Sequence, residues 1–157
     1  MITNFLFERF PDCKIIYGVS PMVHKGVGER VFPKEFTAMS DHRIFYSVDT
    51  FGIPELDKRC VVASHGMIHV DHRLLSKDCQ EMSILVSCSL LKAKIFVPPF
   101  NKWNKHTEEI CSENSIYLIK WEDGWRSMEH NDFNSKITKW YLHARDFNLE
   151  KVIKWAK

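Results

Sequence analysis

Three histidines, at positions 65, 69 and 72, lie close together in a chain that has 8 histidines among 157 residues. His65 and His69 have the i, i+4 spacing that places two side chains on one face of a helical turn, with Cβ atoms about 5–6 Å apart. Two imidazoles at this spacing can bind one zinc ion. Surface or hydrogen-bonded histidines give the same pattern in a histidine-rich chain. The position of His65 directly after a predicted buried strand favours the metal site.

His72 would share the same helical face. A helix that spans residues 65 to 72 rises about 10.5 Å, and three ligands of a single ion rarely come from one helix over that length. We therefore expect the third ligand to come from another strand end. His72 is interpreted as a residue behind the ligands, a substrate contact or a structural histidine.

Residues 96–104 join a predicted strand to a loop and combine two prolines with aromatic and amide side chains. Surfaces that mix flat apolar rings and amides are typical of sugar-binding sites. A rigid strand exit with buried aromatic residues is the alternative. The residues expected to contact a sugar here are Pro99, Phe100, Asn101, Trp103 and Asn104.

Two further segments carry polar groups after predicted strands. Glu122 and Asp123 could supply carboxylates to a cationic site, or they could belong to an ordinary turn. His143 is followed by Arg145 and Asp146. A histidine beside a carboxylate suits general acid catalysis near neutral pH. A histidine that is hydrogen-bonded near a helix start is the alternative interpretation.

Predicted strands and helices alternate along the chain, which indicates βαβ units and a mostly parallel sheet. Such sheets place their functional residues at the carboxyl ends of the strands, and the candidate residues follow the predicted strands directly. Residues 22–57 have no regular pattern, and Ser76 is a predicted helix N-cap. Apolar runs predict strands over 13–19, 59–64, 94–97, 116–121 and 139–143, and helices over 2–10, 76–91, 106–113 and 149–156.

The composition, 45% hydrophobic and 27% charged, is that of one folded domain over residues 1–157. The net charge is only +2 and there is no basic cluster, so neither nucleic acid nor an anionic membrane is an expected partner. No apolar run approaches the roughly 18–20 residues of a membrane span. Five scattered cysteines without a Cys-x-x-Cys pair predict reduced thiols in a cytoplasmic protein.

The His65-x-x-x-His69 pair, the 96–104 segment, Trp121 to Trp125 and Leu142-His143 occur in an order that resembles the polysaccharide deacetylase (NodB-homology) superfamily. The resemblance covers roughly residues 12–147. It is closest to a divergent branch associated with bacterial surface-polysaccharide clusters. The resemblance implies an α/β fold, a distorted (β/α) barrel of mostly parallel strands.

The resemblance also implies a deacetylase chemistry. A divalent metal, usually zinc, would be held by an aspartate together with His65 and His69. It would polarise an acetamide carbonyl and activate water, while a carboxylate acts as the base. His143 would protonate the departing amine. The substrate would be an N-acetylated sugar or a surface-polysaccharide precursor, with residues 99–104, Glu122, Asp123 and Arg145 around it.

The sequence departs from the family pattern at two points. Val97 stands where the family usually has an arginine. The Asp-Asp pair that ends the family's first strand has no counterpart before the predicted strand at 13–19, so we expect the barrel to lack its first βα unit. The third metal ligand stays open among Asp49, His72, Glu122 and Asp123.

Two other functions stay open. The chain could be a catalytically inactive deacetylase relative that binds glycan or a protein partner. It could also be a His-x-x-x-His hydrolase that recruits Asp49, Glu122 or Asp123. A barrel without its first strand would expose a sheet edge, which predicts a homodimer.

Overall fold

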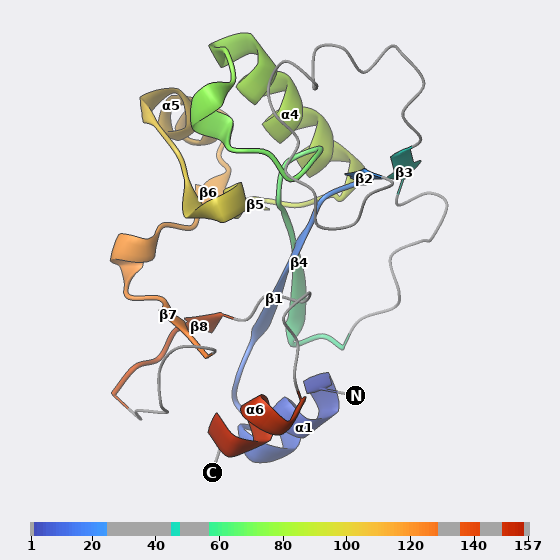
Figure 1. The fold of residues 1–157 in the computed structure, drawn as a ribbon, viewed down its shortest axis with the longest axis vertical. Helices are drawn as coiled ribbons and strands as arrows, with labels where there is room; N and C mark the ends of the chain where they lie inside the picture. Colours follow the sequence, from blue (N-terminus) through green and yellow to red (C-terminus); the bar gives the residue numbers. More distant parts are fainter. Residues whose placement is uncertain (1, 25–44, 48–56, 129–135, 142–148, 156–157) are drawn as a thin grey trace. The chain divides into compact units, whose positions relative to one another are not determined.

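The computed structural model describes residues 2–24, 45–47, 57–128, 136–141 and 149–155 (Figure 1). They fall into two compact units. The first, here called the histidine unit, is Ile16–Ile119, and the second, the terminal unit, is Met1–Ile15 with Lys120–Lys157. The sequence-based assignment of one domain to the whole chain stays a prediction.

A four-stranded sheet with the order β1-β4-β5-β6 organises the histidine unit. Its strands are β1 (Ile15–Val19), β4 (Cys60–Ser64), β5 (Ile95–Phe96) and β6 (Tyr117–Leu118). The pairs β4–β5 and β5–β6 are parallel, and the carboxyl ends of β4 and β5 are in register, with Ser64 opposite Phe96. This confirms an α/β fold with mostly parallel strands.

Two helices connect the parallel strands, α4 (Lys77–Leu90) between β4 and β5, and α5 (Lys105–Glu113) between β5 and β6. The side chain of Ser76 accepts a hydrogen bond from the Cys79 amide at 3.3 Å, which confirms the predicted N-cap. Asn104 and Thr107 form a capping box at the start of α5. Each cap satisfies amide groups that a helix leaves without an internal partner.

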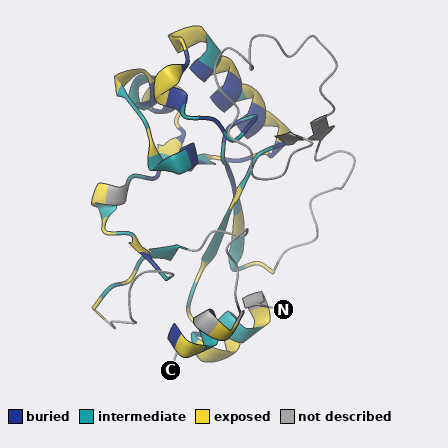
Figure 2. Cartoon of the chain, in the orientation of Figure 1, coloured by how far each residue is buried: buried dark blue, intermediate teal, exposed yellow. Residues whose placement is uncertain are grey.

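The core of the histidine unit lies where α4 and α5 pack against the sheet. Ile84, Phe96 and Ile110 are at most 1% exposed, and each such side chain stabilises the fold by about 1.5–3 kcal/mol through burial. Figure 2 shows buried positions along the inner sides of both helices. The cluster consists of Ile84, Cys88, Phe96, Ile110, Cys111 and Ile116.

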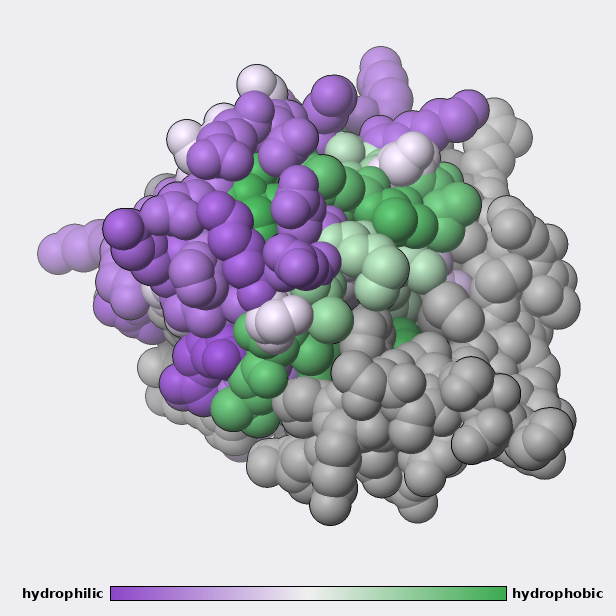
Figure 3. Space-filling view, turned by 90° about the horizontal axis from the view of Figure 1, so that it is seen from above, coloured by the Kyte–Doolittle hydropathy of each residue, from purple (hydrophilic) through white to green (hydrophobic). Residues whose placement is uncertain are grey.

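The face of α4 that turns outward is partly apolar, and its inner face is partly polar. Met82, Val86 and Leu90 are 51%, 42% and 48% exposed, and Figure 3 shows apolar and hydrophilic residues side by side on the surface seen from above. Ser83 and Ser87, by contrast, are completely buried. The inner face of this helix is therefore not continuously apolar.

The terminal unit contains α1 (Ile2–Arg9), α6 (Leu149–Trp155) and two short parallel strands, β7 (Arg126–Ser127) and β8 (Trp140–Tyr141). The Trp155 ring lies 5.7 Å from that of Phe10 and 5.0 Å from that of Trp140. The predicted strand at 139–143 is therefore present as β8, but it pairs with β7 and not with the four-stranded sheet. Its apolar pattern identified a strand without specifying the partner.

Two other differences concern element bounds. The predicted strand over 116–121 ends early, because Trp121–Asp123 forms a 3₁₀ helix in which the Asp123 carboxylate accepts from the Lys120 amide at 3.2 Å. Within the irregular 22–57 region, β2 (Met22–His24) and β3 (Phe45–Ser47) pair antiparallel. Among the described residues, no helix has the length and apolar character to cross a membrane. All five cysteines are free thiols.

Candidate functional site

His65 follows β4 directly and is fixed by contacts from two neighbouring strand ends. Its amide donates to the Val19 carbonyl at 2.8 Å, and its own carbonyl accepts from the Ser20 hydroxyl at 3.1 Å. The imidazole Nδ1 lies 2.6 Å from the carbonyl oxygen of Val97. Because a carbonyl can only accept, Nδ1 carries the proton, and the neutral ring has its lone pair on Nε2. A metal-binding histidine commonly has its tautomer set in this way.

The rings of His65 and His69 lie close together, with centroids 4.8 Å apart and planes at 49°. The predicted helical turn is nevertheless wrong, because residues 67–69 form bends, and the next helical residues are the 3₁₀ helix His72–Leu74. Residues 65–69, here called the histidine loop, bring the two rings together without helical geometry.

Gly66 explains why the histidine loop is not a helix. Its φ is +80°, which L side chains rarely adopt, and a Cβ there would lie 2.7 Å from Cε1 of His72. A glycine is therefore required both by the backbone conformation and by the close approach of His72. The two rings are therefore close, as the i, i+4 spacing predicted, but through a different backbone geometry, and their role as metal ligands stays a prediction.

Phe100 contacts the histidine pair from the segment after β5. Its ring meets that of His69 edge to face, with centroids 4.3 Å apart. Phe100 and the following Asn101 have φ of 56° and 53°; asparagine tolerates this conformation, whereas for a bulky residue such as Phe100 it is uncommon and costs roughly 1–2 kcal/mol. Hydrogen bonds from Asn101 N to Pro98 O at 3.0 Å and from Lys102 N to Pro99 O at 3.1 Å stabilise the turn. The two prolines thus hold an aromatic ring against His69.

His72 is completely buried and has a structural role. Its Nδ1 lies 3.0 Å from the Val70 carbonyl, and its Nε2 lies 3.1 Å from the Ser83 hydroxyl. Burial lowers the pKa of His72 to about 4, because desolvation outweighs the hydrogen bond with Val70. The ring is therefore neutral near pH 7 with both nitrogens hydrogen-bonded. Of the interpretations that the sequence left open, the structure favours the structural histidine.

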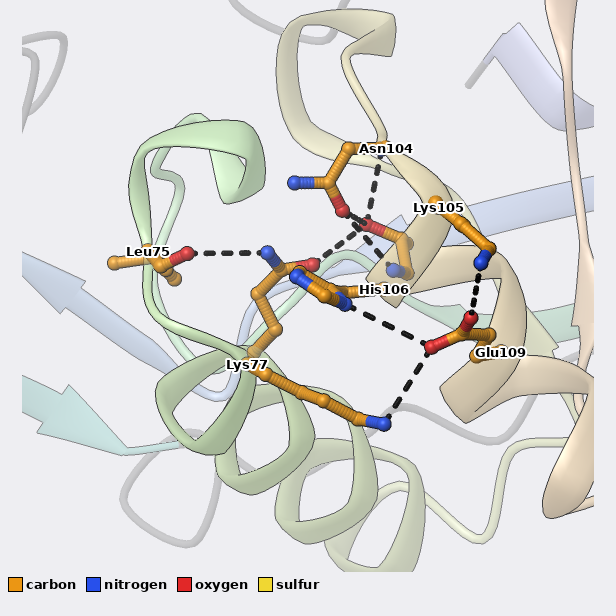
Figure 4. A network of polar contacts seen from close by, with 8 residues as sticks. Leu75, Lys77, Asn104, Lys105, His106 and Glu109 are labelled. Atoms are coloured by element: carbon orange, nitrogen blue, oxygen red, sulfur yellow. Dashed lines mark hydrogen bonds and ion pairs between the residues drawn. The ribbon is translucent and has the colours of Figure 1, made fainter.

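Asn104, one of the predicted sugar contacts, participates in the packing of α4 on α5. Its Oδ1 accepts from the Thr107 amide at 3.2 Å, and the Thr107 hydroxyl donates to Oε1 of Gln80 at 2.7 Å. Gln80 in turn donates to the Leu75 carbonyl at 3.1 Å (Figure 4). The capping contacts therefore account for the amide oxygen of Asn104, and the predicted contact of this residue with a sugar stays a prediction.

The other predicted residues are placed as follows. Pro99 is buried, Trp103 and Asn101 are half-buried, and all three belong to the histidine unit. Glu122, which is exposed, and Asp123 lie in the terminal unit, where the carboxylate of Asp123 accepts from the Lys120 amide. Asp49, His143 and Arg145 lie outside the described residues.

The structure thus brings together His65, His69, Phe100 and the Val97 carbonyl. Two imidazoles, one with its tautomer set by a carbonyl, fit the donor chemistry of a zinc ion. Over the described ranges, no group of three His, Cys, Asp or Glu side chains gathers in a way that could hold a metal.

Sequence reasoning missed the buried serines that support the histidine loop. Ser64, Ser83 and Ser87 are completely buried. The signal that could have identified Ser83 and Ser87 is their i, i+4 spacing on the same helical face as Gln80 and Ile84, where an ordinary amphipathic helix has apolar residues.

No family model, curated protein or solved structure matches the chain. The chemistry of the histidine loop is therefore inferred from its own geometry together with the motif resemblance noted in the sequence.

Proposed function

We propose that the chain is a zinc-dependent hydrolase that removes the acetyl group from an N-acetylated sugar or a surface-polysaccharide precursor. The observation that carries this proposal is the His65–His69 pair at the carboxyl end of β4, with the His65 tautomer set by the Val97 carbonyl. A barrel of the polysaccharide deacetylase type is the fold we propose around this site. The parallel pairing of β4 with β5 and of β5 with β6 supports this proposal, because a barrel of this type consists mostly of parallel strands.

His65, through Nε2, and His69 would hold the ion. The identity of the third ligand stays a prediction from the sequence, and His72 is not proposed for it, since both nitrogens of His72 are already hydrogen-bonded. When bound, zinc supplies a Lewis acid that polarises the acetamide carbonyl and lowers the pKa of water. The protein contributes the orientation of the ligands, because the hydrogen bond at Nδ1 fixes the ring plane of His65.

The remaining steps concern the sugar and the leaving group. Phe100 and Trp103 offer apolar rings, and Asn101 an amide, from the rigid segment after β5. His143 is the proposed acid, which donates a proton to the amine nitrogen as its bond to the acetyl carbon breaks. The products are acetate and the free amino sugar. The five free thiols support the proposed cytoplasmic location.

Deacetylation of a panel of N-acetylated sugars, with and without added zinc, tests the proposal. We expect zinc-dependent acetate release that His143→Ala abolishes. His106→Ala is the control, because it removes a histidine from α5 whose side chain is 49% exposed and pairs only with the nearby Glu109 in the described contacts. Sugar binding without acetate release would contradict the enzyme and identify a glycan-binding relative. Acetate release that is unaffected by zinc removal would contradict the metal.

A further inference from the structure

A buried polar cluster lies beneath the histidine loop. Ser64, His72, Ser83 and Ser87 are all 0% exposed. Burying a hydroxyl or an imidazole is unfavourable unless hydrogen bonds compensate for the lost water. The Ser64 and Ser87 hydroxyls are hydrogen-bonded to each other. The cluster is satisfied by contacts among its own side chains and with the backbone carbonyls of Val70 and α4, and it also accepts hydrogen bonds from two amides of the histidine loop.

Ser83 makes two contacts whose directions can be assigned. The His72 Nδ1, 3.0 Å from the Val70 carbonyl, must carry the proton, so Nε2 of the neutral ring is an acceptor. The Ser83 hydroxyl therefore donates to His72 Nε2 at 3.1 Å. Its oxygen accepts from the Met67 amide, also at 3.1 Å. A single hydroxyl thus joins α4, His72 and the middle residue of the histidine loop.

The preceding amide of the loop, that of Gly66, is also bound by a serine hydroxyl. Gly66 N donates to the hydroxyl of Ser64 at 3.2 Å. Consecutive amides between His65 and His69 are therefore bound by buried serine side chains, where a helix would use its own carbonyls. The approach of His72 to Gly66 completes the support, because the ring excludes any side chain at that position.

We propose that Ser83 is a positioning residue that holds the histidine loop in the conformation in which His65 and His69 face one another. The inference deepens the proposed function and rests on it for the metal. Loss of the hydroxyl leaves the Met67 amide without its acceptor and the buried His72 Nε2 without its donor. The loop then samples conformations in which the two rings are apart, and the affinity for a shared ion falls.

Two measurements on Ser83→Ala test the proposal. Hydrogen exchange of the Met67 amide, followed by NMR without metal, should accelerate about tenfold or more. The affinity for Co²⁺, a spectroscopic substitute for zinc, should fall about 10- to 100-fold, as is typical when a group behind a ligand is removed. Ser83→Thr, which keeps the hydroxyl, should restore both. Ile84→Val changes the neighbouring core residue and is the control. It should destabilise the fold without altering the Met67 exchange rate or the Co²⁺ affinity.

The outcomes separate this inference from the proposed function. Unchanged Met67 exchange in Ser83→Ala overturns the positioning role, whatever the metal does. Faster exchange with unchanged Co²⁺ affinity overturns it as well, because the loop would then move without affecting the pair. If the wild-type protein binds no Co²⁺ and Met67 exchange is faster in Ser83→Ala, Ser83 holds the loop but the histidine pair is not a metal site.

Discussion

Gly66 follows the candidate ligand His65 and packs closely against the ring of His72. Two separate constraints require a glycine here. The φ of Gly66 is +80°, and an added Cβ would lie at a distance of 2.7 Å from Cε1 of His72. Gly124 also has a positive φ, +90°, but a Cβ there would have nothing within 4 Å. The two glycines therefore distinguish the cost of the backbone conformation from the cost of the clash.

We predict that Gly66→Ala is the more damaging of the two substitutions. Gly124→Ala should lower the free energy of unfolding by about 1–2 kcal/mol, the cost of a left-handed alanine. Gly66→Ala should lower it by at least about 1 kcal/mol more, because the His72 ring must also shift. Denaturant unfolding of both variants measures the difference. Equal losses would mean that His72 does not pack against Gly66 as described.

His72 gives a pH dependence whose sign follows from its pKa, which burial lowers from 6.5 to about 4. The folded state holds the ring neutral, so this contribution to stability is complete above pH 6.5 and is lost as the pH falls towards 4. The loss should approach about 3 kcal/mol. We expect the free energy of unfolding to decrease over this interval in the wild type, and less steeply in His72→Gln. Parallel curves for the two proteins would contradict a buried neutral His72.

At the scale of the element, α4 and α5 were predictable because their signals are local. Ser76 begins α4 as an N-cap, and the apolar run ends near the helix end. The sequence could not show that the buried face of α4 includes Ser83 and Ser87, because their partners, in the histidine loop and at the end of β4, are distant in sequence. The loop itself was misassigned as helical, since i, i+4 spacing does not reveal a positive φ at Gly66.

Asn104 permits its structural and binding roles to be separated. Asn104→Ala should lower the free energy of unfolding by about 1 kcal/mol, because the capping bond to the Thr107 amide is lost. Asn104→Asp keeps the acceptor oxygen and should retain stability. It removes the Nδ2 donor, so sugar affinity measured by calorimetry should fall if that amide contacts the substrate. Unchanged affinity would limit Asn104 to the helix cap.

At the scale of the molecule, the sequence predicted an α/β fold and the strands at β1, β4, β5 and β6. The assignment of β8 to the same sheet was wrong, since strand pairing depends on contacts that no local pattern encodes. Three predicted residues, Asp49, His143 and Arg145, lie outside the described ranges. Their roles therefore stay predictions.

A homodimer is the prediction that belongs to the whole molecule. Within the described four-stranded sheet, β1 and β6 are the terminal strands, and terminal strands offer unpaired backbone groups to a second chain. Tyr117 on β6 is 58% exposed. We expect light scattering to give twice the chain mass of 18.5 kDa. A monodisperse monomer would contradict the dimer.

The metal content of the purified protein tests the central claim most directly. Elemental analysis after zinc loading and dialysis should give about one zinc per chain in the wild type and in His106→Ala, consistent with a single site of protein ligands. His65→Ala and His69→Ala should each lose the ion, because each removes one of the two paired imidazoles. Zinc retained by both of these variants, or absent from the wild type, would contradict the assignment of the histidine loop as a metal site.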